Sequence, residues 1–133
     1  MSGLEVGLRA TITADVTEAD TAQALGSGDV PVLGTPRLLA LAEAACVAAV
    51  APNLDDGQTT VGVAASLEHK RASPVDTSVE VEAELTRIDD RRLWFNFIAY
   101  APDEGDDVVI GAGTVERVLV DAGRFMARVR RER

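Results

Sequence analysis

Residues 38–51 read Leu-Leu-Ala-Leu-Ala-Glu-Ala-Ala-Cys-Val-Ala-Ala-Val-Ala, and thirteen of these fourteen residues are apolar. A helix that is apolar on every side is a buried helix, and only Glu43 interrupts this one. Thr35 is a candidate N-cap, and Pro36 suits the first helical position. The sequence therefore predicts one long buried helix over about residues 36–51.

Glu43 lies in the middle of this helix, where a carboxylate needs an ion partner, a hydrogen bond or a proton. Such groups are common at functional sites, so Glu43 is a candidate catalytic residue. The alternative is a structural glutamate that binds an arginine or a backbone donor.

The length of 133 residues and a hydrophobic content of 47% predict a single globular domain over residues 1–133. A net charge of −9 argues against nucleic acids and anionic membranes as partners. The apolar run is too short to span a bilayer, and we find no signal pattern, so we expect a cytoplasmic protein. The single cysteine, Cys46, lies inside the apolar run and is expected to be a small buried hydrophobe.

Strands are predicted on both sides of the helix. Residues 8–16 form one strand before it, after which residues 17–25 suggest a short helix capped by Thr17 or Asp20. Four strands follow the long helix and are expected to form an antiparallel meander, at residues 59–70, 77–88, 93–101 and 108–120. Residues 124–133 suggest a short basic helix.

This order of elements predicts an α+β protein in which a curved antiparallel sheet of about five strands wraps around one long buried helix. A helix that is apolar all round needs cover on every side, and a second subunit could supply what the sheet does not. This is the hot dog fold. Resemblance to this fold implies pairing of domains through a sheet edge, with sites that lie between the subunits.

His69 and Thr35 could carry chemistry. His69 is the only histidine of the chain and could exchange protons near neutral pH, although it could also be a solvated residue at a strand end. Thr35 would need a base within hydrogen-bond reach to act as a nucleophile. Glu43 lies ~12 Å further along the helix axis and ~80° around it, so a histidine from a neighbouring strand could fill the gap.

Gly62 lies inside a predicted strand, where glycine indicates either a bulge or the close approach of a backbone or ligand. Its N–H could stabilise an oxyanion. Arginines cluster toward the C-terminus, where they would suit a phosphate-bearing ligand such as coenzyme A or form a solvated helix face: Arg117, Arg124, Arg128, Arg130, Arg131 and Arg133. Of these, we expect Arg117 to bind substrate. One histidine and one cysteine give no metal site, and no cofactor is expected.

Together these residues resemble the fluoroacetyl-CoA thioesterase family of hot dog proteins, over about residues 5–129. The resemblance rests on Thr35-x7-Glu43-x2-Cys46, Gly62-x6-His69, Ala72-Ser73-Pro74, the strand Val79–Leu85, Asp90–Leu93, Gly111–Arg117 and Phe125-x-Ala127-x-Val129. Residues 26–34 contain no phenylalanine, whereas the fluoroacetyl-specific enzyme has a phenylalanine lid there. The resemblance therefore implies a thioesterase without implying fluoroacetate as the acyl group.

The resemblance implies an acyl-CoA thioesterase that acts on a small or medium acyl group, with Thr35, Glu43 and His69 as catalytic residues and Gly62 near the thioester carbonyl. Water or Thr35 would attack, with His69 as base and then acid. Glu43 would either orient His69 or attack to give an anhydride. We expect a homodimer or a tetramer of dimers.

Two other functions remain open. The first is a hot dog module that binds acyl-CoA without hydrolysing it, because a fold does not fix a function. The second is an acyl-CoA dehydratase, which is disfavoured because its Asp-x4-His pair would need an aspartate at Ala64. The residues also do not distinguish coenzyme A from a carrier protein as the thiol carrier.

Overall fold

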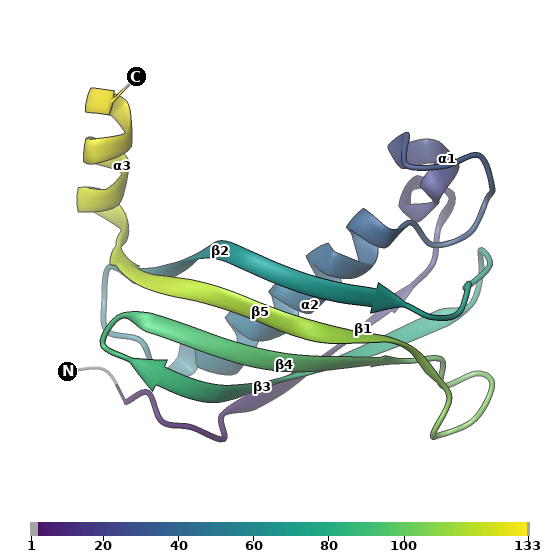
Figure 1. Cartoon of the computed structure of the whole chain (residues 1–133), viewed down its shortest axis with the longest axis horizontal. Coiled ribbons are helices and arrows are strands. Elements are labelled where there is room, and N and C mark those ends of the chain that lie inside the picture. The colour runs from purple at the N-terminus through teal and green to yellow at the C-terminus, as the bar shows by residue number, and fades with distance from the viewer. Residues whose placement is uncertain (1–2, 133) are drawn as a thin grey trace.

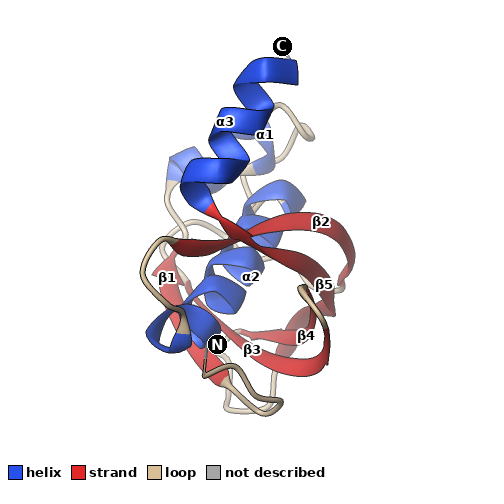
Figure 2. Cartoon of the chain, turned by 90° about the vertical axis from the view of Figure 1, so that its left-hand side faces the viewer, coloured by secondary structure: helices blue, strands red, loops and turns tan. Residues whose placement is uncertain are grey.

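A computed structural model describes residues 3–132 as one curved five-stranded sheet around a central helix (Figure 1). The strands are β1 (Arg9–Asp15), β2 (Gln58–His69), β3 (Ser78–Asp89), β4 (Arg92–Tyr100) and β5 (Val109–Asp121). The α-helices are α1 (Ala22–Leu25), α2 (Thr35–Val50) and α3 (Ala122–Glu132), and two 3-10 turns are η1 (Glu18–Asp20) and η2 (Ala51–Asn53). The α+β class and the curved sheet around one helix are confirmed (Figure 2).

Alternation along the strands decides which face meets α2. The inward positions of β3 and β4 are fully or almost fully buried: Val79, Val81, Ala83, Leu85, Leu93, Phe95, Phe97 and Ala99. They form one core with apolar residues of α2 such as Leu38 and Ala42. Cys46 belongs to this core, and burial raises the pKa of its thiol to about 12. The prediction that Cys46 is a buried hydrophobe is confirmed.

The prediction of a four-strand meander is wrong. All pairs are antiparallel, but the order across the sheet is β1-β3-β4-β5-β2, so β2 pairs with β5 and not with β3. Only β3, β4 and β5 follow one another as hairpins. The link between β2 and β3 has eight residues, 70–77, and includes Pro74, so it has no tight hairpin turn and can cross to the other side of the sheet.

The N-terminal end of α2 differs from the prediction. Gly34 is the N-cap, which places Thr35 at the first helical position and Pro36 at the second. The Thr35 hydroxyl caps no helical N–H, because it is hydrogen-bonded to His69 instead. The shorter helix predicted before it is divided into η1, with Thr17 as N-cap, and α1, capped by the side chain of Thr21.

One face of α2 lies outside the sheet. Pro36, Ala40, Ala44 and Val47 are exposed, so the helix is not buried on every side within this chain. With η2 the helical segment reaches 19 residues, Thr35–Asn53, and is long and apolar enough to cross a membrane by those two criteria. The exclusion based on length was therefore wrong, although the packing of α2 into the sheet is that of a core helix.

Candidate functional site

Thr35 and His69 meet at one end of the molecule. Thr35 begins α2 and His69 ends β2, and the Thr35 Oγ1 and His69 Nδ1 atoms lie 2.8 Å apart. Both side chains line a cavity of about 250 Å³, together with Leu33 of the preceding loop and Lys70. The sequence singled out both residues, and the structure brings them together.

The surroundings of His69 favour its neutral form. Burial lowers the pKa of the imidazole below its ordinary value of 6.5, and a backbone interaction with Arg71 only partly opposes this shift. Nε2 is buried and has no hydrogen-bond partner within residues 3–132. A neutral His69 that carries its proton on Nε2 can accept the Thr35 hydroxyl proton at Nδ1, which is the arrangement that activates a nucleophile.

Glu43 forms a second cluster with Arg117. Arg117 Nη1 donates to Glu43 Oε2 at 2.7 Å, while Nε and Nη2 donate to Thr60 Oγ1 at 2.8 Å and the Thr60 carbonyl at 2.9 Å. Arg117 is only 7% exposed, whereas the Glu43 side chain is 39% exposed. The arginine partner that the sequence left open for Glu43 is therefore Arg117, which uses its guanidinium inside the protein rather than at the surface.

Thr60 was missed by the sequence reasoning, and Arg117 was grouped with the wrong neighbours. Arg117 shares the inward face of β5 with Val115, which is buried. An arginine in phase with buried positions of a strand predicts a buried polar partner, and this signal was present in the sequence. Arg117 of β5 stands opposite Gly62 of β2, so the Arg117 cluster lies beside this glycine.

Gly62 is the position where the Glu43 carboxylate approaches the sheet. A Cβ atom built on Gly62 would lie 2.6 Å from Glu43 Oε2 and 3.2 Å from Arg117 Nη1. The register of β2 against β5 also shifts between Gly62 and Ala64. The bulge expected at this glycine is present, and the group that approaches it closely is the Glu43 side chain rather than a backbone or a ligand.

The two clusters are separate within one chain. Gly62 and His69 are seven positions apart on β2, about 23 Å of strand. No hydrogen bond joins Glu43 to Thr35 or His69 in the part of the chain that the structure describes, so Glu43 does not orient His69 within one protomer. Residues 3–132 also contain no group of three or more His, Cys, Asp or Glu that could hold a metal ion.

Comparisons with known proteins agree with this fold. The model of the family FlK, described as fluoroacetyl-CoA-specific thioesterase, matches residues 16–123. A fluoroacetyl-CoA thioesterase of Streptantibioticus cattleyicolor is 38% identical over 101 residues, which are 76% of this chain and 70% of that protein.

Solved structures extend the match to almost the whole chain. A variant of the fluoroacetyl-CoA thioesterase FlK in complex with acetyl-CoA is 32% identical, with a TM-score of 0.87 over 97% of this chain and 98% of that one. A hypothetical protein of Thermus thermophilus, described as a thioesterase superfamily member, is 26% identical, with a TM-score of 0.88 over 98% and 94%. The predicted hot dog fold is confirmed.

We predict that Gly62→Ala destabilises the protein by about 1–3 kcal/mol, because the new methyl group displaces the Glu43 carboxylate and leaves a buried Arg117 donor unpaired. Chemical denaturation measures this loss. The control is the same change in a Glu43→Ala background, where no carboxylate remains to collide with the methyl group. An equal loss in both backgrounds would contradict the close approach.

We predict that His69 titrates below pH 6.5, because burial disfavours its charged form. As the only histidine, it gives a single imidazole Hε1 signal to follow in an NMR titration. Because the folded protein binds this proton less readily than the unfolded chain does, protein stability depends on pH. The contribution of neutral His69 to the free energy of unfolding is fully present above the unfolded-state pKa. It is lost as the pH falls through the folded-state pKa. A pKa at or above 6.5 would overturn this assignment.

Proposed function

The chain belongs to the fluoroacetyl-CoA-specific thioesterase family and is a thioester hydrolase, and from this premise we propose that it hydrolyses coenzyme A thioesters of small or medium acyl groups. The observation that carries the proposal is the Thr35–His69 hydrogen bond in the cavity at the end of α2. A related enzyme crystallised with acetyl-CoA supports coenzyme A as the carrier. The absence of phenylalanine from residues 26–34 is the reason not to assign fluoroacetate as the acyl group.

The acting unit in this proposal is a homodimer joined through β2. β2 is a sheet edge, and residues 62–66 of it, Gly-Val-Ala-Ala-Ser, are all exposed. Val63 is 51% exposed, and the uncovered face of α2 adds Val47 at 40%. The opposite edge, β1, instead exposes Arg9, Thr11, Thr13 and Asp15. Since unprotected apolar strand edges pair with other strands, β2 is the edge that fits a second copy of this chain.

Antiparallel pairing of two β2 strands would bring the two clusters together. With a twofold axis near Ala64, the middle of the exposed run, Gly62 of the partner subunit lies opposite Ser66, three residues from His69. That is about 10 Å along the strand, less than half the separation within one protomer. The proposed site therefore combines Thr35 and His69 of one subunit with Glu43 and Gly62 of the other.

The chemistry follows from these positions. His69 takes a proton from the Thr35 hydroxyl, or from a water molecule bound beside it, as the oxygen attacks the thioester carbon. It then returns the proton to the thiolate that leaves as the C–S bond breaks, and where Thr35 attacked, His69 next deprotonates a water molecule that hydrolyses the acyl-threonine ester and releases the acid. Gly62 N–H would stabilise the oxyanion. The Glu43 carboxylate, oriented by Arg117, either binds the attacking water or attacks the carbonyl itself. We keep a cytoplasmic location as a prediction, together with the possible assembly of dimers into tetramers.

We predict hydrolysis of acyl-CoA in a series of chain lengths, measured with a thiol reporter, and a loss of about 10²–10⁴-fold in kcat/KM for His69→Gln. His69 is the general base in this proposal, and glutamine keeps a similar size without exchanging protons. Circular dichroism of the variant controls for folding. A binding module would show acyl-CoA binding with no turnover in the wild type, and full turnover by His69→Gln would remove His69 from the mechanism.

We predict a dimer at micromolar concentration by size exclusion with light scattering. Val63→Asp should shift the protein toward a monomer and lower hydrolysis in parallel, because it places a charge in the proposed strand junction. Thr11→Asp is the matched control, since it adds the same charge to the opposite sheet edge. A wild-type monomer with full activity would contradict the shared site.

A further inference from the structure

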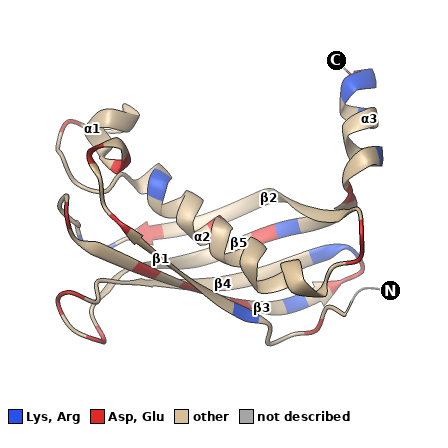
Figure 3. Cartoon of the chain, turned by 180° about the vertical axis from the view of Figure 1, so that it is seen from behind, with Lys and Arg blue, Asp and Glu red and all other residues tan. Residues whose placement is uncertain are grey.

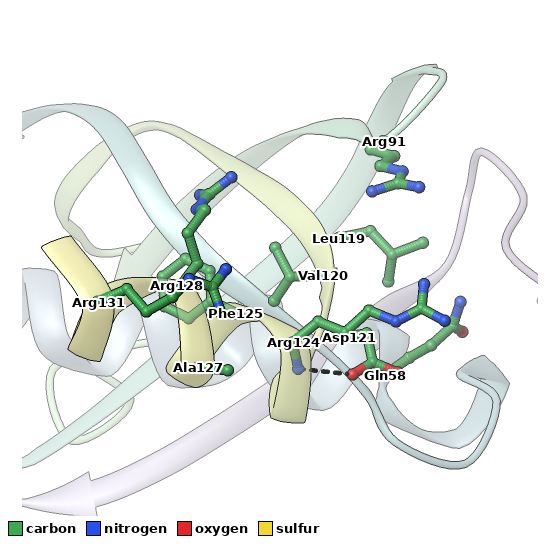
Figure 4. A pocket seen from close by; sticks show the side chains of 10 residues that line it. All are labelled: Gln58, Arg91, Leu119, Val120, Asp121, Arg124, Phe125, Ala127, Arg128 and Arg131. Atoms are coloured by element: carbon green, nitrogen blue, oxygen red, sulfur yellow. Dashed lines mark hydrogen bonds between the residues drawn. The ribbon is translucent and has the colours of Figure 1, made fainter.

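The molecule has a second and larger cavity at the end of the sheet remote from His69. Its volume is about 580 Å³, and it lies between α3, the end of β5 and the turn that joins β3 to β4. Four arginines line it, Arg124, Arg128 and Arg131 from α3 and Arg91 from the turn. Figure 4 shows Arg91 and Arg124 on opposite sides of Leu119. The backbone N–H of Leu119 donates to the Arg91 carbonyl at 2.8 Å, which holds the turn against this cavity.

The charge of this cavity is opposite to that of the chain. The chain carries a net charge of −9, yet among residues 3–132 Asp121 is the only acidic residue that lines the cavity. One Asp121 oxygen accepts the backbone N–H of Arg124 at 3.0 Å, so it is engaged at the start of α3. Arg128 also lies 3.6 Å from Glu132 on the helix surface. Figure 3 shows that acidic residues are spread over the strands and loops, whereas the last turns of α3 are basic.

An aromatic ring completes the cavity. Phe125 lines it, and the Arg128 guanidinium lies 5.9 Å from the centre of the Phe125 ring. Arginine forks match the geometry of phosphate oxygens, and an aromatic face stacks on a nucleobase. The combination fits a phosphorylated nucleoside better than an isolated inorganic anion.

In the proposed dimer, this cavity lies close to the Thr35–His69 cavity of the partner subunit. Gln58, at the start of β2, lines it, whereas His69 ends the same strand, about 36 Å away. Gln58 and Lys70 are each six residues from Ala64, so antiparallel β2 strands centred there place Gln58 opposite Lys70 of the partner subunit. In Figure 1, α3 rises past β2 on the free side of the sheet, at the end opposite α1. No residue of α3 is buried within the chain, so the helix is available to a neighbouring subunit and its ligand.

We infer that the α3 cavity binds the phosphoadenosine diphosphate part of a coenzyme A thioester whose acyl group lies at Thr35 and His69 of the partner subunit. This inference rests on the proposed function and on the β2 pairing. It assigns the nucleotide to Arg91, Arg124 and Arg128 rather than to Arg117, whose guanidinium is bound to Glu43 and Thr60.

The test compares two thioesters of the same acyl group, one of coenzyme A and one of pantetheine, which lacks the nucleotide. The double variant Arg124→Gln/Arg128→Gln should raise KM for the acyl-CoA about tenfold or more and leave hydrolysis of the acyl-pantetheine unchanged. Each single variant, Arg124→Gln and Arg128→Gln, is compared with Arg130→Gln as its control, because Arg130→Gln removes one arginine charge from α3 without lining the cavity. Calorimetric titration with adenosine 3′,5′-bisphosphate should give binding by the wild type that is at least tenfold weaker in the double variant.

The outcomes separate the two proposals. If the wild type hydrolyses neither thioester, the proposed function fails, and the titration still tests the cavity. Equal effects of the double variant on both thioesters, or an effect of Arg130→Gln as large as that of the double variant, would overturn the inference. A defect confined to an acyl-carrier-protein thioester, or to binding of anionic vesicles, would also overturn it.

Discussion

The ion pair between Glu43 and Arg117 connects the central helix to the strands that the helix contacts least, β2, β4 and β5. α2 makes most of its sheet contacts with β1 and β3. Glu43 leaves the helix on the other side and meets Arg117 of β5, which also binds Thr60 of β2. A buried arginine without its partners would leave an uncompensated charge, so this cluster fixes the distance between α2 and β2. Gly62 is required where the carboxylate lies against the strand.

The same cluster also lies on the β2 edge of the sheet, where we propose the functional site. The cluster lies beside the exposed run of β2, residues 62–66, and leaves the Glu43 carboxylate partly open to solvent. The Thr35–His69 pair lies at the far end of the same strand. In the proposed dimer, each protomer supplies both clusters from one sheet edge, and a twofold axis through that edge would bring the two clusters of different protomers together. The fold and the proposed chemistry depend on the same strand.

Much of the fold could be predicted because the local periodicity of apolar residues indicates the helix and the strands. The alternation of Val79 to Leu85 fixes which face of β3 is buried, and the apolar run fixes α2. Strand order could not be predicted in this way, because the pairing of β2 with β5 joins segments about fifty residues apart and leaves no local signature. The N-cap was misplaced by one residue because Gly34 and Thr35 both suit that position, and the hydroxyl of Thr35 is used by a histidine distant in sequence. The sequence showed that Glu43 is a charged residue in an apolar helix. It did not show that Arg117 is its partner, because that contact depends on how β5 is placed in the sheet.

We propose that Arg117 acts on the reaction only by holding Glu43, and a double-mutant cycle on kcat/KM tests this role. The variants are Glu43→Gln, Arg117→Met and the double variant, each measured per folded molecule on the best acyl-CoA. We expect both single changes to reduce kcat/KM, and Arg117→Met to cause almost no further loss once Glu43 is glutamine. Independent, additive losses would contradict it, because Arg117 would then contribute to the reaction without Glu43.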